Sequence, residues 1–167
     1  SHVTEEITKW SDLDKSVTGN YLGMKLGEIW GFETEGIFQT EEEVKNHASQ
    51  AKYETGSFKF GVGDIKYKDL NGDGVINNGD PNNKEHGVGT LENHGDLKVI
   101  GNELPDFEYG ITLGLDYKGF DFSAYFQGVG SRDYWAYGNV AIPSGMSALD
   151  AIFTHQTDYW TPQNTDA

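Results

Sequence analysis

The chain has 167 residues and a formal net charge of −15, from 27 acidic against 12 basic residues. This charge disfavours nucleic acid and anionic lipid surfaces as partners and favours cations. The chain contains no cysteine, so neither a disulfide framework nor a thiolate metal site is available. Apolar residues make up only 36 % of the chain, while glycine is frequent at 22 residues and aromatics reach 13 %. This composition predicts a mainly β protein with turns and long loops rather than a helical bundle.

The first part of the chain predicts short elements joined by long loops. Residues 1–20 show no sustained period, and we interpret them as a lead-in or the end of a strand. Glycine and aromatic residues between 21 and 38 favour short extended segments. A helix is expected after Thr40, which has the capping partner Glu43 three residues later, and it should end before Gly56. Short strands are expected at 63–68 and 97–102, within a loop region that spans 21–104.

Residues 69–80 have the spacing of a calcium-binding loop. Gly74 occupies position 6, where such a loop turns sharply. The candidate ligands of Ca²⁺ are the side chains of Asp69, Asn71, Asp73 and Asp80, the carbonyl of Val75, and Asn77 directly or through water. Asp80 stands where an EF-hand has a longer, bidentate Glu, so weaker affinity or a different geometry is expected. The alternative interpretation is a polar turn cluster, since the same residue types favour turns.

A β-hairpin is the clearest element of the sequence, within residues 105–128. Apolar and polar residues alternate without a miss from Phe107 to Tyr117, and the alternation resumes at Phe120 after the turn residues Lys118 and Gly119. The alternation fits two interpretations. The hairpin packs its apolar face on the core of a soluble protein, or it supplies two strands of a membrane barrel. Eleven alternating residues match the roughly 9–11 that cross a bilayer, and aromatics lie at both ends of the apolar face.

The region 129–167 is a second long loop region, with a short helix expected from Ser147. Two interpretations of its aromatic residues are open. They stack on a sugar ligand, or they pack the loop onto the rest of the protein, and we prefer the second. The candidate ligand-contacting aromatics are Trp30, Tyr134, Trp135 and Tyr137.

Six segments form one recognisable series from about residue 21 to the end of the chain: GEIWGF at 27–32, GIFQTEEE at 36–43, GDIKYKDLNGDG at 63–74, VIGN at 99–102, YKGFDF at 117–122 with FQG at 126–128, and YWTPQN at 159–164. Together they resemble one family, the SusC/RagA-type TonB-dependent outer-membrane transporters of Bacteroidetes.

The resemblance implies the C-terminal barrel portion of such a transporter, with the TonB box and the plug lying in other parts of the protein. The implied fold is a large antiparallel outer-membrane barrel of the 22-stranded type. It would import glycans or other oligomeric nutrients, oligosaccharide or peptide, with a SusD-like lipoprotein and with TonB as the energy source. Residues 21–104 and 129–167 would lie on the extracellular side, and the calcium would be structural. The segment 81–96 departs from the family as an enlarged insert.

Two other classes of function compete with a transporter. The alternative is a secreted calcium-dependent carbohydrate-binding or adhesion module. An enzyme is not expected, because the sequence contains no nucleophile–base motif, and among 27 acidic residues some carboxylates always lie close together.

Overall fold

The computed structural model describes residues 16–19, 21, 23–136 and 153–165. These residues are mainly antiparallel β with few helical turns, as the composition predicted. In chain order the elements are β1 (Glu28–Phe32), β2 (Thr34–Ile37), α1 (Glu41–Asn46), η1 (Ala51–Tyr53), β3 (Ile65–Tyr67), β4 (Leu97–Asn102), β5 (Glu108–Tyr117), β6 (Phe120–Val129) and η3 (Thr154–Thr157). Among the described residues no helix has the length and apolar character needed to cross a membrane.

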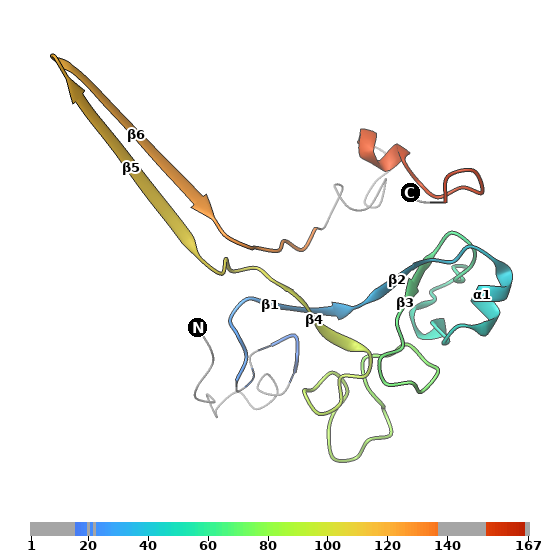
Figure 1. Cartoon of the computed structure of the whole chain (residues 1–167). Coiled ribbons are helices and arrows are strands. Elements are labelled where there is room, and N and C mark those ends of the chain that lie inside the picture. The colour runs from blue at the N-terminus through green and yellow to red at the C-terminus, as the bar shows by residue number, and fades with distance from the viewer. Residues whose placement is uncertain (1–15, 20, 22, 137–152, 166–167) are drawn as a thin grey trace.

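The strands form three two-stranded sheets. β1 pairs with β4, β2 with β3, and β5 with β6. The first two sheets and the loops between them form one body, and the β5–β6 hairpin projects away from it as a long arm (Figure 1). The buried apolar side chains all lie in the body: Val17, Tyr21, Met24, Phe38 and Ile76.

Helix α1 begins where the sequence predicts and ends before Gly56, as expected. The Thr40 hydroxyl accepts the Glu43 N–H at 3.2 Å, so the predicted N-cap is confirmed. The helix stops at Asn46, well before Gly56. Ser49 donates its N–H to Gly74 O at 2.8 Å, and the N–H of Ile76 donates to Ser49 O at 2.9 Å. The chain therefore leaves the helix to pair with the distant 69–80 loop, a tertiary contact that local propensity does not encode.

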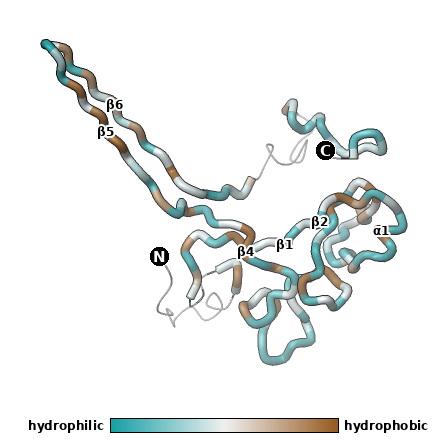
Figure 2. Tube along the Cα trace, viewed as in Figure 1, coloured by the Kyte–Doolittle hydropathy of each residue, from teal (hydrophilic) through white to brown (hydrophobic). Residues whose placement is uncertain are grey.

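The hairpin has the predicted strands and the predicted turn. Lys118 and Gly119 have φ values of +47° and +86°, the combination of a type I′ turn. The register places apolar residues opposite one another, including Ile111 with Phe126 and Leu115 with Phe122. Hydropathy alternates along both strands (Figure 2). One face of the hairpin is therefore apolar and the other polar.

Aromatic rings cover glycines across the hairpin. A Cβ added to Gly128 would lie 2.2 Å from the Tyr109 ring, and one added to Gly110 would lie 2.7 Å from the Tyr125 hydroxyl. The two pairs lie on opposite faces, because Tyr109 and Gly110 are consecutive on one strand. A side chain at Gly128 or Gly110 would collide with the ring that covers it, so both positions require glycine.

The C-terminal segment packs on the body beside α1. The Trp160 Nε1–H donates to Gln39 Oε1 at 3.1 Å, and the Trp160 ring lies 2.7 Å from the position a Cβ would take on Gly63. Residues 147–152, where a helix is expected, lie outside the described residues, and the 3₁₀ turn η3 occupies Thr154–Thr157.

Candidate functional site

The loop 69–80 is folded by bonds between its own side chains and backbone. The Asp69 carboxylate accepts the N–H groups of Gly72 and Gly74 at 2.7 and 2.9 Å. Asn71 Oδ1 accepts the Asp73 N–H at 2.9 Å, and Asp73 Oδ1 accepts the Val75 N–H at 2.8 Å. Loop positions 1, 3 and 5 thus each hold the backbone that follows them. Such bonds are also typical of polar turns, so they fit both interpretations of the loop.

Two of the candidate oxygen ligands, Asp73 Oδ2 and Val75 O, accept hydrogen bonds from the same side-chain amide group. Asn77 Nδ2 donates to Asp73 Oδ2 at 3.2 Å and to Val75 O at 2.9 Å. Asn77 Oδ1 accepts the Gly79 N–H at 2.7 Å, and this bond fixes the orientation of the amide. An N–H donor therefore lies where a cation would meet both oxygens. For a cation to bind there, Asn77 would have to turn aside or act through water.

The carboxyl of Asp73 has a lowered pKa. The largest cause is the hydrogen bond from the Val75 N–H, and the amides of Asn71 and Asn77 act in the same direction. All three donors favour the charged form of the carboxylate, and together they outweigh the opposing effect of burial. Asp73 is therefore ionised over the whole neutral range.

Asp96 is a functional candidate that the sequence reasoning missed. Its side chain is completely buried. One carboxylate oxygen accepts the Leu70 N–H at 2.8 Å, and the other accepts the Asn77 N–H at 2.8 Å. The carboxylate thus ties the second position of the loop to the ninth. The available signal was its place directly before the strand 97–102, where the enlarged insert returns to the loop.

Asp80 lies on the insert side of the loop. Its carboxylate is exposed and accepts the Asn82 N–H at 2.8 Å. Its backbone is held by Asn93, whose Oδ1 accepts the Asp80 N–H at 2.8 Å and whose Nδ2 donates to Asp80 O at 3.0 Å. A Cβ on Gly95 would lie 2.4 Å from Asn77 O, so the end of the insert packs against Asn77. The insert is therefore closed by the bonds between Asn93 and Asp80, and Asp96 comes shortly after Asn93 in the chain.

The loop offers a mixed set of oxygens rather than an acidic cluster. Within the described part of the chain, no three His, Asp or Glu side chains form a group that could hold a metal ion. A cation in the loop would thus depend on the amide and carbonyl oxygens beside the carboxylates of Asp69 and Asp73. Ca²⁺ accepts such mixed oxygen sets.

Three of the four candidate aromatics line one cleft. Trp30 from β1 and Tyr134 and Trp135 from the segment after β6 border a cleft of about 400 Å³. Tyr137 lies outside the described residues. Trp135 is 51 % exposed, and its ring lies 3.6 Å from the position a Cβ would take on Gly31. It therefore packs on β1 with one part and borders the cleft with another.

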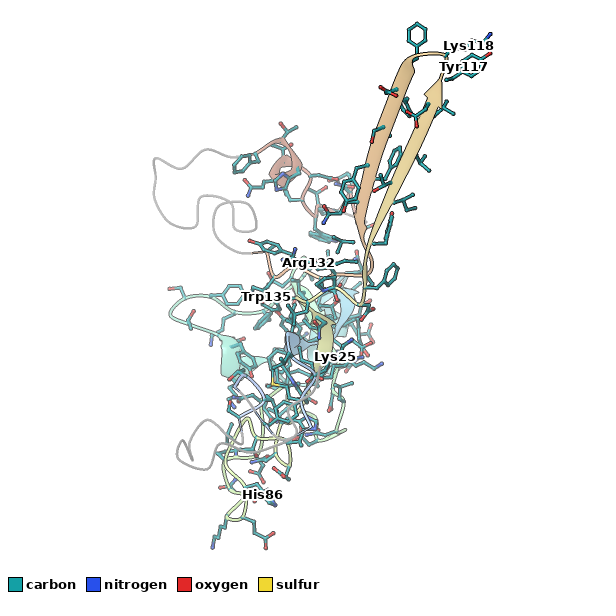
Figure 3. All side chains as sticks on the ribbon, turned by 90° about the vertical axis from the view of Figure 1, so that its left-hand side faces the viewer. Lys25, His86, Tyr117, Lys118, Arg132 and Trp135 are labelled. Atoms are coloured by element: carbon teal, nitrogen blue, oxygen red, sulfur yellow. The ribbon has the colours of Figure 1, made fainter. Side chains whose placement is uncertain are left out.

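Hydrogen bonds between distant segments build this cleft. Asp133 N–H donates to Asn102 O, and Asn102 N–H donates to Asp133 Oδ2, both at 2.8 Å. The Asn102 amide also donates to Leu26 O at 3.0 Å, and Glu103 N–H donates to Gly27 O at 2.8 Å. The end of β4 therefore holds both the turn before β1 and the segment after β6. Lys25, Arg132 and Trp135 are labelled in this region in Figure 3.

Tyr21 and Glu28 form a hydrogen-bonded pair, and the Tyr21 ring contacts Trp30. The Tyr21 hydroxyl donates to Glu28 Oε2, and the Lys25 N–H donates to Glu28 Oε1 at 3.0 Å. Burial, followed by the bond to the Glu28 carboxylate, raises the pKa of the Tyr21 hydroxyl. The hydroxyl therefore stays a proton donor and fixes this carboxylate in place.

Comparison with known proteins finds two partial relatives, both from Formosa agariphila. The chain is 32 % identical to TonB-dependent receptor P26 over 105 residues, which cover 62 % of the chain and 9 % of that receptor. It is 26 % identical to TonB-dependent receptor P3 over 144 residues, which cover 86 % of the chain and 12 % of that receptor. No protein-family model matches the chain.

The chain thus spans about a tenth of the length of the curated relatives it matches. The similarity to P3 includes most of the chain, so it is not confined to a single motif. Receptors of this kind are outer-membrane transporters and not enzymes. Both relatives have the name TonB-dependent receptor, so this chain is similar to parts of two proteins of that kind.

Proposed function

We propose that this chain is a C-terminal barrel portion of a TonB-dependent outer-membrane transporter of the SusC/RagA type. The whole protein imports glycans or other oligomeric nutrients, with a SusD-like lipoprotein at its outer face and TonB as the energy source. The observation that carries the proposal is the β5–β6 hairpin, and the two partial relatives support it independently.

The apolar face of the hairpin has the dimensions of a membrane-facing surface. Each strand has ten residues, within the range of about 9–11 that spans a bilayer when the strand is tilted. Leu113 is 52 % exposed and Leu115 is 63 % exposed, so the described part of the chain leaves this face uncovered. Lipid would cover it in the assembled barrel, and neighbouring strands would pair with the two free edges.

The opposite face of the hairpin has the character of a barrel interior. The pairs Gly114 with Ser123 and Asp116 with Asp121 lie on it. Outer-membrane barrel strands alternate in this way, apolar toward lipid and polar toward the lumen. The two faces of the hairpin therefore differ in the same way as the lipid side and the lumen side of a barrel strand differ.

The ends of the hairpin predict its orientation. A two-residue turn closes one end, and the large body lies at the other end (Figure 1). Outer-membrane barrels have short periplasmic turns and long extracellular loops. Residues 21–104 and 129–167 would then lie outside the cell, where a SusD-like lipoprotein meets the transporter.

Cell fractionation and affinity purification test this proposal on the full-length protein in its own host. We expect the protein in the outer membrane, with slower migration on denaturing gels after boiling, as for a stable barrel, and with a lipoprotein co-purifying. Recovery from the culture medium without detergent would contradict the proposal. That result would instead favour the alternative, a secreted calcium-dependent carbohydrate-binding or adhesion module.

We also propose that the loop 69–80 binds Ca²⁺ as a structural ion. Asp73 Oδ2 and Val75 O face one point, and Asp69 and Asn71 add oxygens from the first turn of the loop. Asn77 acts through water or after turning aside, and Asp80 completes the set as the twelfth position of the loop. Asp96 is the competing candidate for that last place, because its buried carboxylate already meets the loop backbone.

A thermal unfolding experiment tests the calcium proposal on the full-length protein. We expect Ca²⁺ to raise the melting temperature and a chelator to lower it, because an ion that binds only the folded loop stabilises the folded state. Mg²⁺ at the same concentration is the control, since its strict octahedral geometry suits this mixed loop poorly. Identical melting curves with Ca²⁺ and with chelator would contradict it.

A further inference from the structure

We propose that the cleft bordered by Trp30, Tyr134 and Trp135 binds a sugar unit of an uncharged oligosaccharide. The inference rests on the proposed import of oligomeric nutrients and narrows the class of substrate. The cleft has a volume of about 400 Å³, within the range of about 300–1,000 Å³ typical of ligand pockets.

The aromatic rings come from two segments that meet only in the fold. Trp30 is held in place by ring contacts on two sides, with centroids 6.2 Å from Tyr21 and 5.5 Å from His94. Tyr134 and Trp135 are 71 % and 51 % exposed, so both present ring surface to solvent. Large rigid rings bury much apolar area at a small cost in conformational entropy. They suit the apolar C–H face of a sugar ring.

A carboxylate in the same cleft can accept hydrogen bonds from sugar hydroxyls. Glu103 borders the cleft, and its side chain is exposed. Its backbone is fixed, since its N–H donates to Gly27 O at 2.8 Å and its O accepts Arg132 Nε–H at 2.9 Å. Its carboxylate has no hydrogen bond or ion pair with another described residue, whereas that of Glu28 is engaged by Tyr21 and Lys25. Glu103 is therefore the available acceptor.

The charges around the cleft favour an uncharged ligand over an acidic one. Glu28 and Glu103 both border it, and the chain as a whole carries −15. The nearby cation Lys25 is already paired with Asp106 at 2.8 Å. Arg132 keeps its charge, but it is not one of the residues that border the cleft, and its Nε–H donates to the Glu103 carbonyl. An oligosaccharide with carboxylate or sulfate groups would meet repulsion here, whereas hydroxyl groups find acceptors.

Calorimetric titration of the full-length protein in detergent tests the inference. The uncharged probes are maltohexaose, cellohexaose and mannohexaose, and the acidic probe is hexagalacturonate. We expect saturable binding of at least one uncharged probe and weaker binding of hexagalacturonate. Trp135→Ala should weaken that binding about tenfold, a loss of about 1.4 kcal/mol. Glu103→Gln should weaken it severalfold, because charge-assisted hydrogen bonds are stronger than neutral ones.

Two further variants separate ligand contact from a merely structural effect. Trp135→Phe keeps an aromatic face and should retain most of the affinity. Tyr159→Ala removes a ring that is 66 % exposed outside the cleft and should leave the affinity unchanged. The inference is overturned if no uncharged probe binds, if hexagalacturonate binds more tightly, or if Trp135→Ala binds like the parent. Each of these results can occur in a protein that sits in the outer membrane, so they are distinct from a failure of the proposed transport function.

Discussion

Asn77 and Asp96 bond to each other in both directions. The Asn77 N–H donates to Asp96 Oδ2, and the Asp96 N–H donates to Asn77 O, both at 2.8 Å. Asn77 lies in the loop and Asp96 is the last residue of the insert, so this pair closes the insert onto the candidate metal loop. A completely buried carboxylate therefore holds the loop next to the start of β4.

Replacing this carboxylate should loosen the loop. Asp96→Asn keeps the size of the side chain but removes the charge that accepts the N–H groups of Leu70 and Asn77. We expect a local loss of about 1.5–3 kcal/mol, the usual range for hydrogen bonds to charged groups. Hydrogen exchange of peptides covering 69–80 measures it. Glu92→Gln is the matched control, because that carboxylate is exposed in the insert and is not a candidate ligand, so the exchange should be almost unchanged.

The effect of calcium should persist well into the acid range. The pKa of Asp73 is lowered in the folded state, mainly by the Val75 N–H. Its contribution to stability is therefore fully present above the unfolded-state pKa, about 3.9 for Asp. That contribution disappears only as the pH falls through the lower folded-state value. We expect the calcium-induced rise in melting temperature to remain at pH 5, and its loss between pH 7 and pH 5 would contradict this assignment.

Removing the Asp73 carboxylate should weaken metal binding without disturbing the hairpin. Asp73→Ala deletes one candidate ligand and the bond to the Val75 N–H. We expect a lower calcium affinity in a titration of the full-length variant and an unchanged boiling-dependent gel shift. A calcium titration that matches the parent would argue for the polar turn cluster instead.

The two faces of the hairpin should respond differently to charge. Leu113 and Thr112 are neighbours near the middle of β5 and face opposite sides. Leu113→Arg would place a charge in the lipid, which costs about 2–4 kcal/mol at the midplane of a barrel. Thr112→Arg would place the same charge toward the lumen. We expect the first variant to assemble poorly and the second to assemble like the parent, as judged by the gel shift. Equal tolerance would show that lipid does not cover the apolar face.

The ring of Tyr109 should make Gly128 intolerant of a side chain. A Cβ there would lie 2.2 Å from the ring, so Gly128→Ala forces the ring to move. Overpacking of this kind costs about 1–3 kcal/mol. In a double-mutant cycle, Tyr109→Ala should remove most of the added cost of Gly128→Ala. Strictly additive effects on unfolding would show that the two residues do not interact.

The sequence predicts the local elements of this chain better than its distant contacts. Strict alternation from Phe107 onward, with Lys118 and Gly119 between the strands, is sufficient to predict both strands and the turn of the hairpin. The cap at Thr40 is likewise a local pattern. The early end of α1 depends on Ser49 pairing with the distant loop, and no local pattern encodes that contact.

The same distinction applies to the candidate sites. The spacing of Asp69, Asn71 and Asp73 is visible in the sequence, because these residues act within one turn of loop. The position of Asp96 depends on closure of the insert, which the sequence showed only as an enlarged segment. Trp30 and Trp135 border the same cleft because Asn102 bonds to Asp133 across the body, a contact that spans 31 residues.

The most direct test of the transporter account is the position of the hairpin turn relative to the membrane. The described chain has no cysteine, so single substitutions can be labelled in a full-length protein freed of other cysteines. Lys118 lies at the tip of the hairpin, and His86, in the same insert as Lys84, lies at the far end of the molecule (Figure 3). With a membrane-impermeant maleimide, Lys84→Cys should be labelled in intact cells, and Lys118→Cys only after the outer membrane is permeabilised. Equal labelling of Lys118→Cys in intact cells would contradict the account.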